Sequence, residues 1–186
     1  AAQNCHVAAI KLLLENKAKI DKAAHDGRTP LYTAAQAGYV AVIKLLLENN
    51  AKIGKTSNMG ATPLIVAAQN GHVAVVELLL ENKAKVDKAA NDGSTPLLVA
   101  SQNGHVAVMK VLLEKKAKVE KAIHSGTNKG ATPLFVAAQN CHVAAIKLLL
   151  ENKAEVDKAM NDGCTPLYIA VANGHVAVIL ELLLNH

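Results

Sequence analysis

The sequence predicts an all-α solenoid in which short pairs of helices stack side by side, and three observations lead to this prediction. Residues 1–18 recur unchanged as residues 137–154. Half of the chain is apolar, yet only 2% is aromatic, which favours packed helices over an aromatic-rich sheet. The tripeptide Thr-Pro-Leu recurs at spacings of 33, 33, 37 and 33 residues, beginning at Thr29, Thr62, Thr95, Thr132 and Thr165. A fixed period of this length is typical of repeat proteins.

The first helix of each unit is predicted to begin at the Thr-Pro pair. The Thr hydroxyl is a natural N-cap, and Pro is tolerated at the first helical position because its missing N–H would have no partner there. In the second complete unit this helix runs from Pro63 to about Gln69 and ends at Asn70-Gly71.

The second helix of the same unit is predicted from about Val73 to Asn82. Its apolar residues Val73, Val76, Leu79 and Leu80 recur at helical spacing. Two helices this short cannot bury their own apolar faces, so the units must stack and share a continuous core.

An extended loop with a tight turn is predicted between one helix pair and the next. Residues 83–94 contain Asn-Asp-Gly near their end, and Gly93 can adopt a positive φ at little cost. We call each such loop a finger.

The repeated letters resemble the ankyrin repeat family. The shared pattern is D-G-x-T-P-L-x-x-A-A-x-x-G-H-x-x-V-x-x-L-L, and the resemblance covers essentially the whole chain. It implies a single domain over residues 1–186. The implied units are a half repeat over 1–23, repeats at about 24–56, 57–89, 90–126 and 127–159, and a terminal repeat over 160–186.

The sequence departs from the family pattern at two recurring positions. The His that usually follows Thr-Pro-Leu is replaced by apolar or aromatic residues, which exchanges a local hydrogen bond for packing. The Gly expected after the second helix is replaced by Lys17, Asn50, Lys83, Lys116 and Lys153. If these residues are left-handed, each non-glycine residue costs about 1–2 kcal/mol, least for Asn.

The last unit differs again, because Glu181 stands where earlier units hold a core Leu such as Leu45. A buried unpaired carboxylate is costly, so Glu181 indicates a terminal unit with no neighbour stacked on that side. Mutational drift at a frayed end is an equally good explanation.

No enzymatic activity, metal or other cofactor is expected. The same slot of successive units holds His6, His72, His105, His142 and His175. Stacked helices lie about 8–10 Å apart, too far for equivalent residues to share one ion, so we assign these histidines a structural role at the interhelical turn. The Cys-His pairs at 5–6 and 141–142 have nothing to orient the His and no oxyanion donor. No phosphate loop or hydrolase motif occurs.

The cysteine count and the hydropathy pattern predict an intracellular, cytoplasmic protein without a membrane span. Three cysteines at 5, 141 and 164 form an odd set without metal spacing, as expected of free thiols in a reducing compartment. No apolar run approaches the roughly 18 residues that cross a bilayer, and no export signal begins the chain.

Lysines gather after each second helix and along the fingers and give most of the net charge of +5. Such a stripe could bind phosphates, but Arg forks and aromatic platforms are nearly absent and acidic residues interleave. A solvated face is the favoured reading, and we do not expect a nucleic-acid partner.

The resemblance to ankyrin arrays implies binding through the finger tips and the exposed side of the first helices. The implied finger residues are His25, Asp26, Arg28, Asn58, Met59, Asn91, Asp92, Ser94, Asn128, Lys129, Asn161 and Asp162. The implied helix residues are Gln69, Asn70, Gln102, Asn103, Gln139 and Asn140. The fingers vary between units and carry any specificity, with His25, Arg28, Met59 and Lys129 as anchors. The excess residues before Thr132 should lengthen one finger.

The leading functional hypothesis is therefore a monomeric interaction module that binds another protein. Two alternatives stay open: an electrostatic module for acidic or nucleic-acid partners, and an engineered ankyrin scaffold without a natural ligand. Verbatim duplication favours recent copying or construction, whereas the irregular Cys, Met and inserted residues weigh against a purely consensus design.

Overall fold

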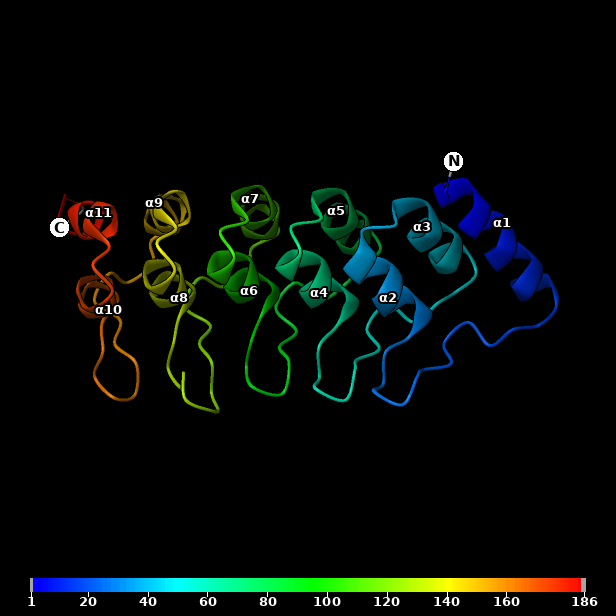
Figure 1. Ribbon diagram of the computed structural model, residues 1–186, viewed down its shortest axis with the longest axis horizontal. Coiled ribbons are helices and arrows are strands. Elements are labelled where there is room, and N and C mark those ends of the chain that lie inside the picture. The colour runs from blue at the N-terminus through cyan, green and yellow to red at the C-terminus, as the bar shows by residue number, and fades with distance from the viewer. Residues whose placement is uncertain (1, 185–186) are drawn as a thin grey trace.

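The computed structural model describes the backbone of residues 2–184 and the side chains of residues 7–184. Over this range the chain forms eleven helices and no strand. Figure 1 shows them in one row from the N-terminal to the C-terminal end, in two layers, with the fingers projecting to one side. One layer holds α2 (Pro30–Ala37), α4 (Pro63–Gln69), α6 (Pro96–Gln102), α8 (Pro133–Gln139) and α10 (Pro166–Ala172). The other holds α1 (Ala2–Glu15), α3 (Val40–Glu48), α5 (Val73–Glu81), α7 (Val106–Glu114), α9 (Val143–Glu151) and α11 (Val176–Leu184). The all-α solenoid is confirmed.

The first helix of each pair begins where the Thr-Pro pairs predict. Each Thr has extended backbone, and its hydroxyl accepts the N–H three residues later, as Thr95 does from Leu98 at 3.2 Å. The predicted helices in the second complete unit are also confirmed, with the second one ending at Glu81, one residue before the predicted Asn82.

The shared core lies between successive pairs. Val76 and Leu79 of α5 are fully buried, and α5 contacts both α3 and α7. The equivalent residues Leu112 of α7 and Leu149 of α9 are also fully buried. Each unit therefore completes the core of its neighbours, as the pattern predicted.

The predicted left-handed residues after the second helices are confirmed. Positive φ values of 63–68° occur at Lys17, Asn50, Lys83, Lys116 and Lys153. Cys141 has φ 61° as well, because it stands where other units place a Gly such as Gly71. The fold therefore holds non-glycine residues in a conformation that disfavours them, a cost that packing between the units must offset.

The two verbatim copies adopt different backbones. Residues 140–142 form the turn between α8 and α9, whereas the same letters at residues 4–6 lie inside the continuous helix α1. The placement of His6 at an interhelical turn is therefore wrong for the backbone, and its side chain lies outside the described residues. The half repeat contains one long helix in place of a turn and a helix.

The interpretation of Glu181 as a residue with no neighbour on its side is also wrong. Its side chain is only 17% exposed, and its Oε2 lies 3.3 Å from Lys147 Nζ in the preceding unit. The residue faces a stacked neighbour, and the lysine of that neighbour compensates its charge.

Candidate functional site

The fingers form a connected edge of the molecule. Each finger closes on itself through backbone hydrogen bonds, such as those from Ala90 N–H to Ser94 O at 2.9 Å and from Gly93 N–H to Ala90 O at 3.1 Å. Neighbouring fingers are joined by further backbone bonds, including Asn58 N–H to Asp26 O at 2.9 Å and Asn91 N–H to Met59 O at 3.0 Å. The connections hold the tips in fixed register, so side chains from different units present one surface.

Two of the predicted contact residues have their side-chain N–H groups engaged between fingers. Asn58 Nδ2 donates to His25 O at 2.9 Å, and Asn91 Nδ2 donates to Asn58 O at 3.0 Å. Both also pack against a glycine of the preceding finger: a Cβ on Gly60 would lie 2.2 Å from Asn91 Oδ1. These two asparagines join the fingers.

Other predicted tip residues point their side chains to solvent. Arg28 is about half exposed, and its Nε lies 3.1 Å from Asp26 Oδ2. Its guanidinium also lies over the Tyr32 ring, 5.5 Å from the centroid. Met59 on the next finger is 78% exposed. The first two fingers thus present an oriented cation and a large apolar side chain on adjacent tips.

The remaining tip residues repeat one turn. Asp26, Asp92 and Asp162 each accept the backbone N–H two residues later. Ser94 adds a hydroxyl hydrogen bond to Asp92. The N–H of Cys164 lowers the pKa of the Asp162 carboxyl, and a second contribution comes from the Cys164 side chain. Asn161 links the last two fingers, since its N–H bonds to Lys129 O at 3.1 Å.

The predicted longer finger is present, and its register is defined by hydrogen bonds. Ile123 N–H bonds to Ala131 O across the base, and His124 N–H bonds to Asp92 O of the preceding finger. His124 therefore takes the place that Asn58 and Asn91 hold elsewhere. The four additional residues, 125–128, follow His124 and are exposed, and the N–H of Ser125 also bonds to Asp92 O at 3.3 Å. Asn128 therefore belongs to the extension.

The amide residues of the first-layer helices divide into two groups. Asn70, Asn103 and Asn140 donate their side-chain Nδ2 to the last turn of their own helix, each at 2.7 Å. The side chains of Gln69 and Gln102 are exposed and that of Gln139 is half-buried. Gln69 and Gln102 therefore expose their side chains to solvent, whereas Gln139 is partly covered.

The histidine ladder has the structural role that we assigned to it wherever its side chains are described. Nε2 of His72, His105 and His142 lies 3.0 Å from the carbonyl oxygen of Gln36, Gln69 and Gln102, respectively. A carbonyl only accepts, so Nε2 carries the proton. Each ring also lies against a glycine of the preceding unit, where a Cβ would meet it at 2.6–2.9 Å. The histidines thus connect consecutive units.

Two cysteines lie within the residues whose side chains are described. Cys141 and Cys164 are free thiols, and the side chain of Cys5 lies outside the described residues. Partial burial, followed by the hydrogen bond and charge of Asp162, raises the pKa of Cys164. A raised pKa leaves less thiolate for nucleophilic attack.

The lysine stripe is partly structural. Nζ of Lys55 and Lys121 donates to the backbone oxygens of Asp21 and Asp87 in the preceding unit, at 2.7 and 2.8 Å. Lys88 Nζ donates to Gly54 O at 2.9 Å. These ammonium groups connect units, which supports the reading of the stripe as a solvated structural face.

Comparison with known families decides the identity of the fold. The family model for ankyrin repeats matches residues 1–57, 50–123 and 119–186. The chain belongs to the ankyrin repeat family. Ankyrin repeats are generally protein–protein interaction modules and are typically non-enzymatic scaffolds. A search against individually curated proteins gives no match. Within the described residues, no helix of this ankyrin array is long and apolar enough to cross a membrane.

The sequence reasoning missed one exposed aromatic residue. Tyr168 of α10 is 61% exposed, whereas Tyr32 at the same position of α2 is 6% exposed. The local letters around the two tyrosines are alike, so only their places in the ankyrin stack distinguish them. No sequence signal could have separated a buried tyrosine from an exposed one here.

Proposed function

We propose that this ankyrin array binds a partner protein through its finger tips, with Arg28 and Met59 as the principal contacts. The observation that carries the proposal is their adjacency on connected fingers. Arg28 is held by Asp26 and the Tyr32 ring, so a partner would lose little side-chain entropy in engaging it. Met59 adds a 78% exposed, adaptable apolar side chain on the next finger.

The chemistry of these two contacts defines the kind of partner. An arginine guanidinium recognises carboxylates with planar, directional geometry, and a methionine accommodates varied apolar shapes. The partner surface we propose therefore presents a carboxylate next to an apolar side chain. The extension at residues 125–128 and the exposed Lys129 supply further contacts along the same edge.

Affinity capture followed by variant analysis tests the proposal. A protein captured from lysate is purified, and its affinity is measured against wild type, Arg28→Ala, Met59→Ala and a deletion of residues 125–128. Interface residues of this kind cost about 2 kcal/mol when truncated, which is roughly a 30-fold loss of affinity. Lys110→Ala, on the exposed face of the second-layer helix α7, is the matched control and should bind as wild type does.

Three results would overturn the proposal. Equal binding by all the finger variants would move the interface elsewhere. Failure to retain any partner would favour a scaffold without a natural ligand. Nucleic-acid binding with a steep salt dependence would favour the electrostatic module.

A further inference from the structure

A carboxylate ladder joins the loops that follow the second helices. Asp21 Oδ1 accepts the backbone N–H of Lys52 at 3.0 Å, and Asp87 Oδ1 accepts that of Lys118 at 3.1 Å. At the interface after that of Asp87, Glu120 Oε1 accepts the N–H of Glu155 at 2.9 Å. In each case an acidic side chain of one unit binds the main chain of the next.

The ladder lacks its carboxylate at one interface. Gly54 stands where the flanking units have Asp21 and Asp87, so the equivalent N–H, that of Lys85, is offered no side-chain acceptor from the preceding unit. The backbone does not require a glycine there. Its φ lies outside the left-handed range, and a Cβ on Gly54 would meet nothing within 4 Å.

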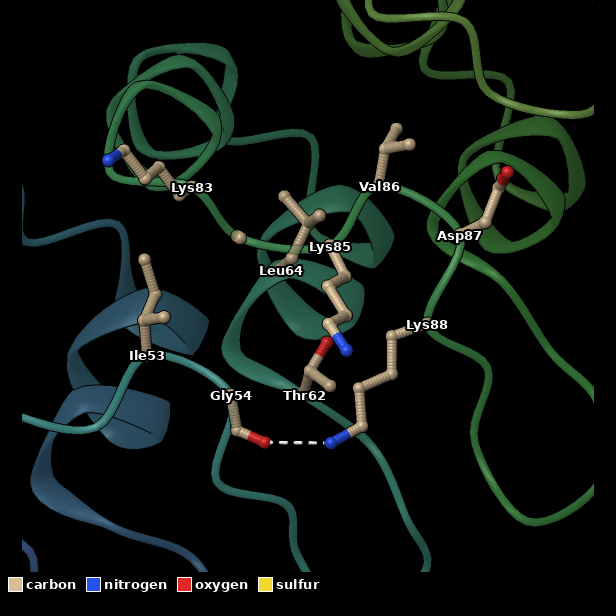
Figure 2. A pocket seen from close by; sticks show the side chains of 10 residues that line it. Ile53, Gly54, Thr62, Leu64, Lys83, Lys85, Val86, Asp87 and Lys88 are labelled. Carbon is tan, nitrogen blue, oxygen red and sulfur yellow. Dashed lines mark hydrogen bonds between the residues drawn. The ribbon is translucent and has the colours of Figure 1, made fainter.

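An open pocket occupies the place of the missing carboxylate. It has a volume of about 790 Å³ and lies between Gly54 and the loop at residues 83–88. Figure 2 shows Lys85 and Lys88 extending toward the Gly54 and Thr62 side of this pocket, while the Asp87 carboxylate points away from them. Asp87 is directed to the next unit, where it accepts the Lys118 N–H.

The charged residues that line the pocket are mostly lysines. Lys83, Lys85 and Lys88 line it together with Asp87, whose carboxylate is already engaged. Lys88 uses one donor on Gly54 O at 2.9 Å, and an ammonium group has three donors. The ammonium groups of Lys85 and Lys88 therefore lie on the Gly54 side of the pocket, at the interface where the neighbouring units have an acidic side chain (Figure 2).

We propose that the Gly54 pocket is an oxyanion site, which binds a carboxylate or a phosphate group in the position of the absent aspartate. The anion accepts the Lys85 N–H and pairs with the surrounding ammonium groups. This site lies on the loops that follow α3 and α5 in the chain, and it does not include the tip residues of the fingers. It gives the lysine stripe one localised binding function instead of a diffuse one.

The test uses a matched pair of variants in the full chain. Gly54→Asp restores the ladder and should fill the site, and Gly54→Asn should compete for the Lys85 N–H without adding a charge. Asp87→Gly opens an equivalent pocket at the next interface, beside Lys116, Lys118 and Lys121. Sodium phosphate, sodium acetate and N-acetyl-aspartate amide are titrated at constant ionic strength, with sodium chloride as the balance. Backbone amide shifts are followed by NMR.

The expected result is a saturable shift of the Lys85 amide in wild type. Gly54→Asp should abolish it, and Gly54→Asn should weaken the dissociation constant at least tenfold. Asp87→Gly should acquire a new saturable shift at Lys118. Preference for phosphate would assign the site to free phosphate or phosphate esters, and preference for the aspartate derivative would assign it to acidic protein side chains. A shift without saturation, or the same response in wild type and Gly54→Asp, would overturn the proposal.

Discussion

The verbatim duplication provides a stability experiment with its own internal control. Leu13 and Leu149 occupy the same position of identical 18-residue segments. Leu149 is fully buried, with α9 lying between α7 and α11, whereas Leu13 is 59% exposed on α1. Truncation of either residue to Ala removes the same atoms from the same local sequence. Any difference in the free energy of unfolding therefore comes from tertiary packing.

The expected magnitudes follow from these exposures. Leu149→Ala empties a fully buried site between units and should cost about 2–5 kcal/mol. Full burial of a Leu side chain is worth about 1.5–3 kcal/mol, so the roughly two fifths of Leu13 that is buried contributes about 1 kcal/mol at most. Leu13→Ala also leaves no closed cavity. Its cost should therefore stay below about 1 kcal/mol.

Urea denaturation followed by far-ultraviolet circular dichroism measures both variants, with the slope m compared to check that unfolding remains cooperative. Thermal midpoints give a second reading. A change of 1 kcal/mol corresponds to about 2–4 °C for a chain of this size, so Leu149→Ala should lower the midpoint by roughly 4–20 °C. Equal losses for the two variants would refute the assignment of the core, because identical letters would then be equally important regardless of burial.

Three further predictions concern single residues. Lys116 has φ 63°, so Lys116→Gly should raise the free energy of unfolding by about 0.5–1 kcal/mol because glycine relieves the left-handed strain. Lys110→Gly, inside α7, should lower the free energy of unfolding by a similar amount. A lower free energy of unfolding for both variants in urea titrations would contradict this prediction. Thr95→Val should cost about 0.5–2 kcal/mol through loss of the cap on Leu98 N–H, and Thr95→Ser should recover most of it in the same assay. The pKa of Asp162 should lie below the usual value of 3.8 because its carboxylate accepts the Cys164 N–H. Its contribution to the free energy of unfolding is therefore present above pH 3.8 and is lost as the pH falls through the lower pKa of the folded state. A carboxyl midpoint at or above 3.8, measured by NMR, would contradict a stabilising hydrogen bond from Cys164.

Much of the fold could be predicted because each local signal agrees with the others. Thr-Pro specifies where a first helix begins, the apolar spacing specifies which face of the second helix is buried, and Asn-Asp-Gly specifies the finger turn. The site was predictable only as a surface. The letters identified the finger residues, but they could not separate Arg28, which faces solvent, from Asn58 and Asn91, whose amides bind the neighbouring finger.

Pairings between units were outside the reach of the sequence. Glu181 was predicted to face an unstacked side and instead pairs with Lys147, because its orientation depends on the rotation of one unit against the next. The pocket at Gly54 has the same origin. Gly54 lacks the carboxylate that binds the next unit elsewhere, and this difference is recognised only once the loops of two units are placed side by side.

The amino-acid sequence by itself determined the period, the start of each first helix and the apolar face of the second helices, since these signals lie within a few residues. Only the tertiary structure decided which conformation a given segment adopts. Within the repeated segment, residues 2–15 form the continuous helix α1, whereas the equivalent residues 138–151 include the end of α8, a turn and α9. In the second copy the turn is held by His142, which donates to Gln102 O of the preceding unit, and by His175, which donates to Gln139 O from the following one. Because the letters of the two copies are identical, the difference between them comes from their tertiary surroundings and not from local sequence preference.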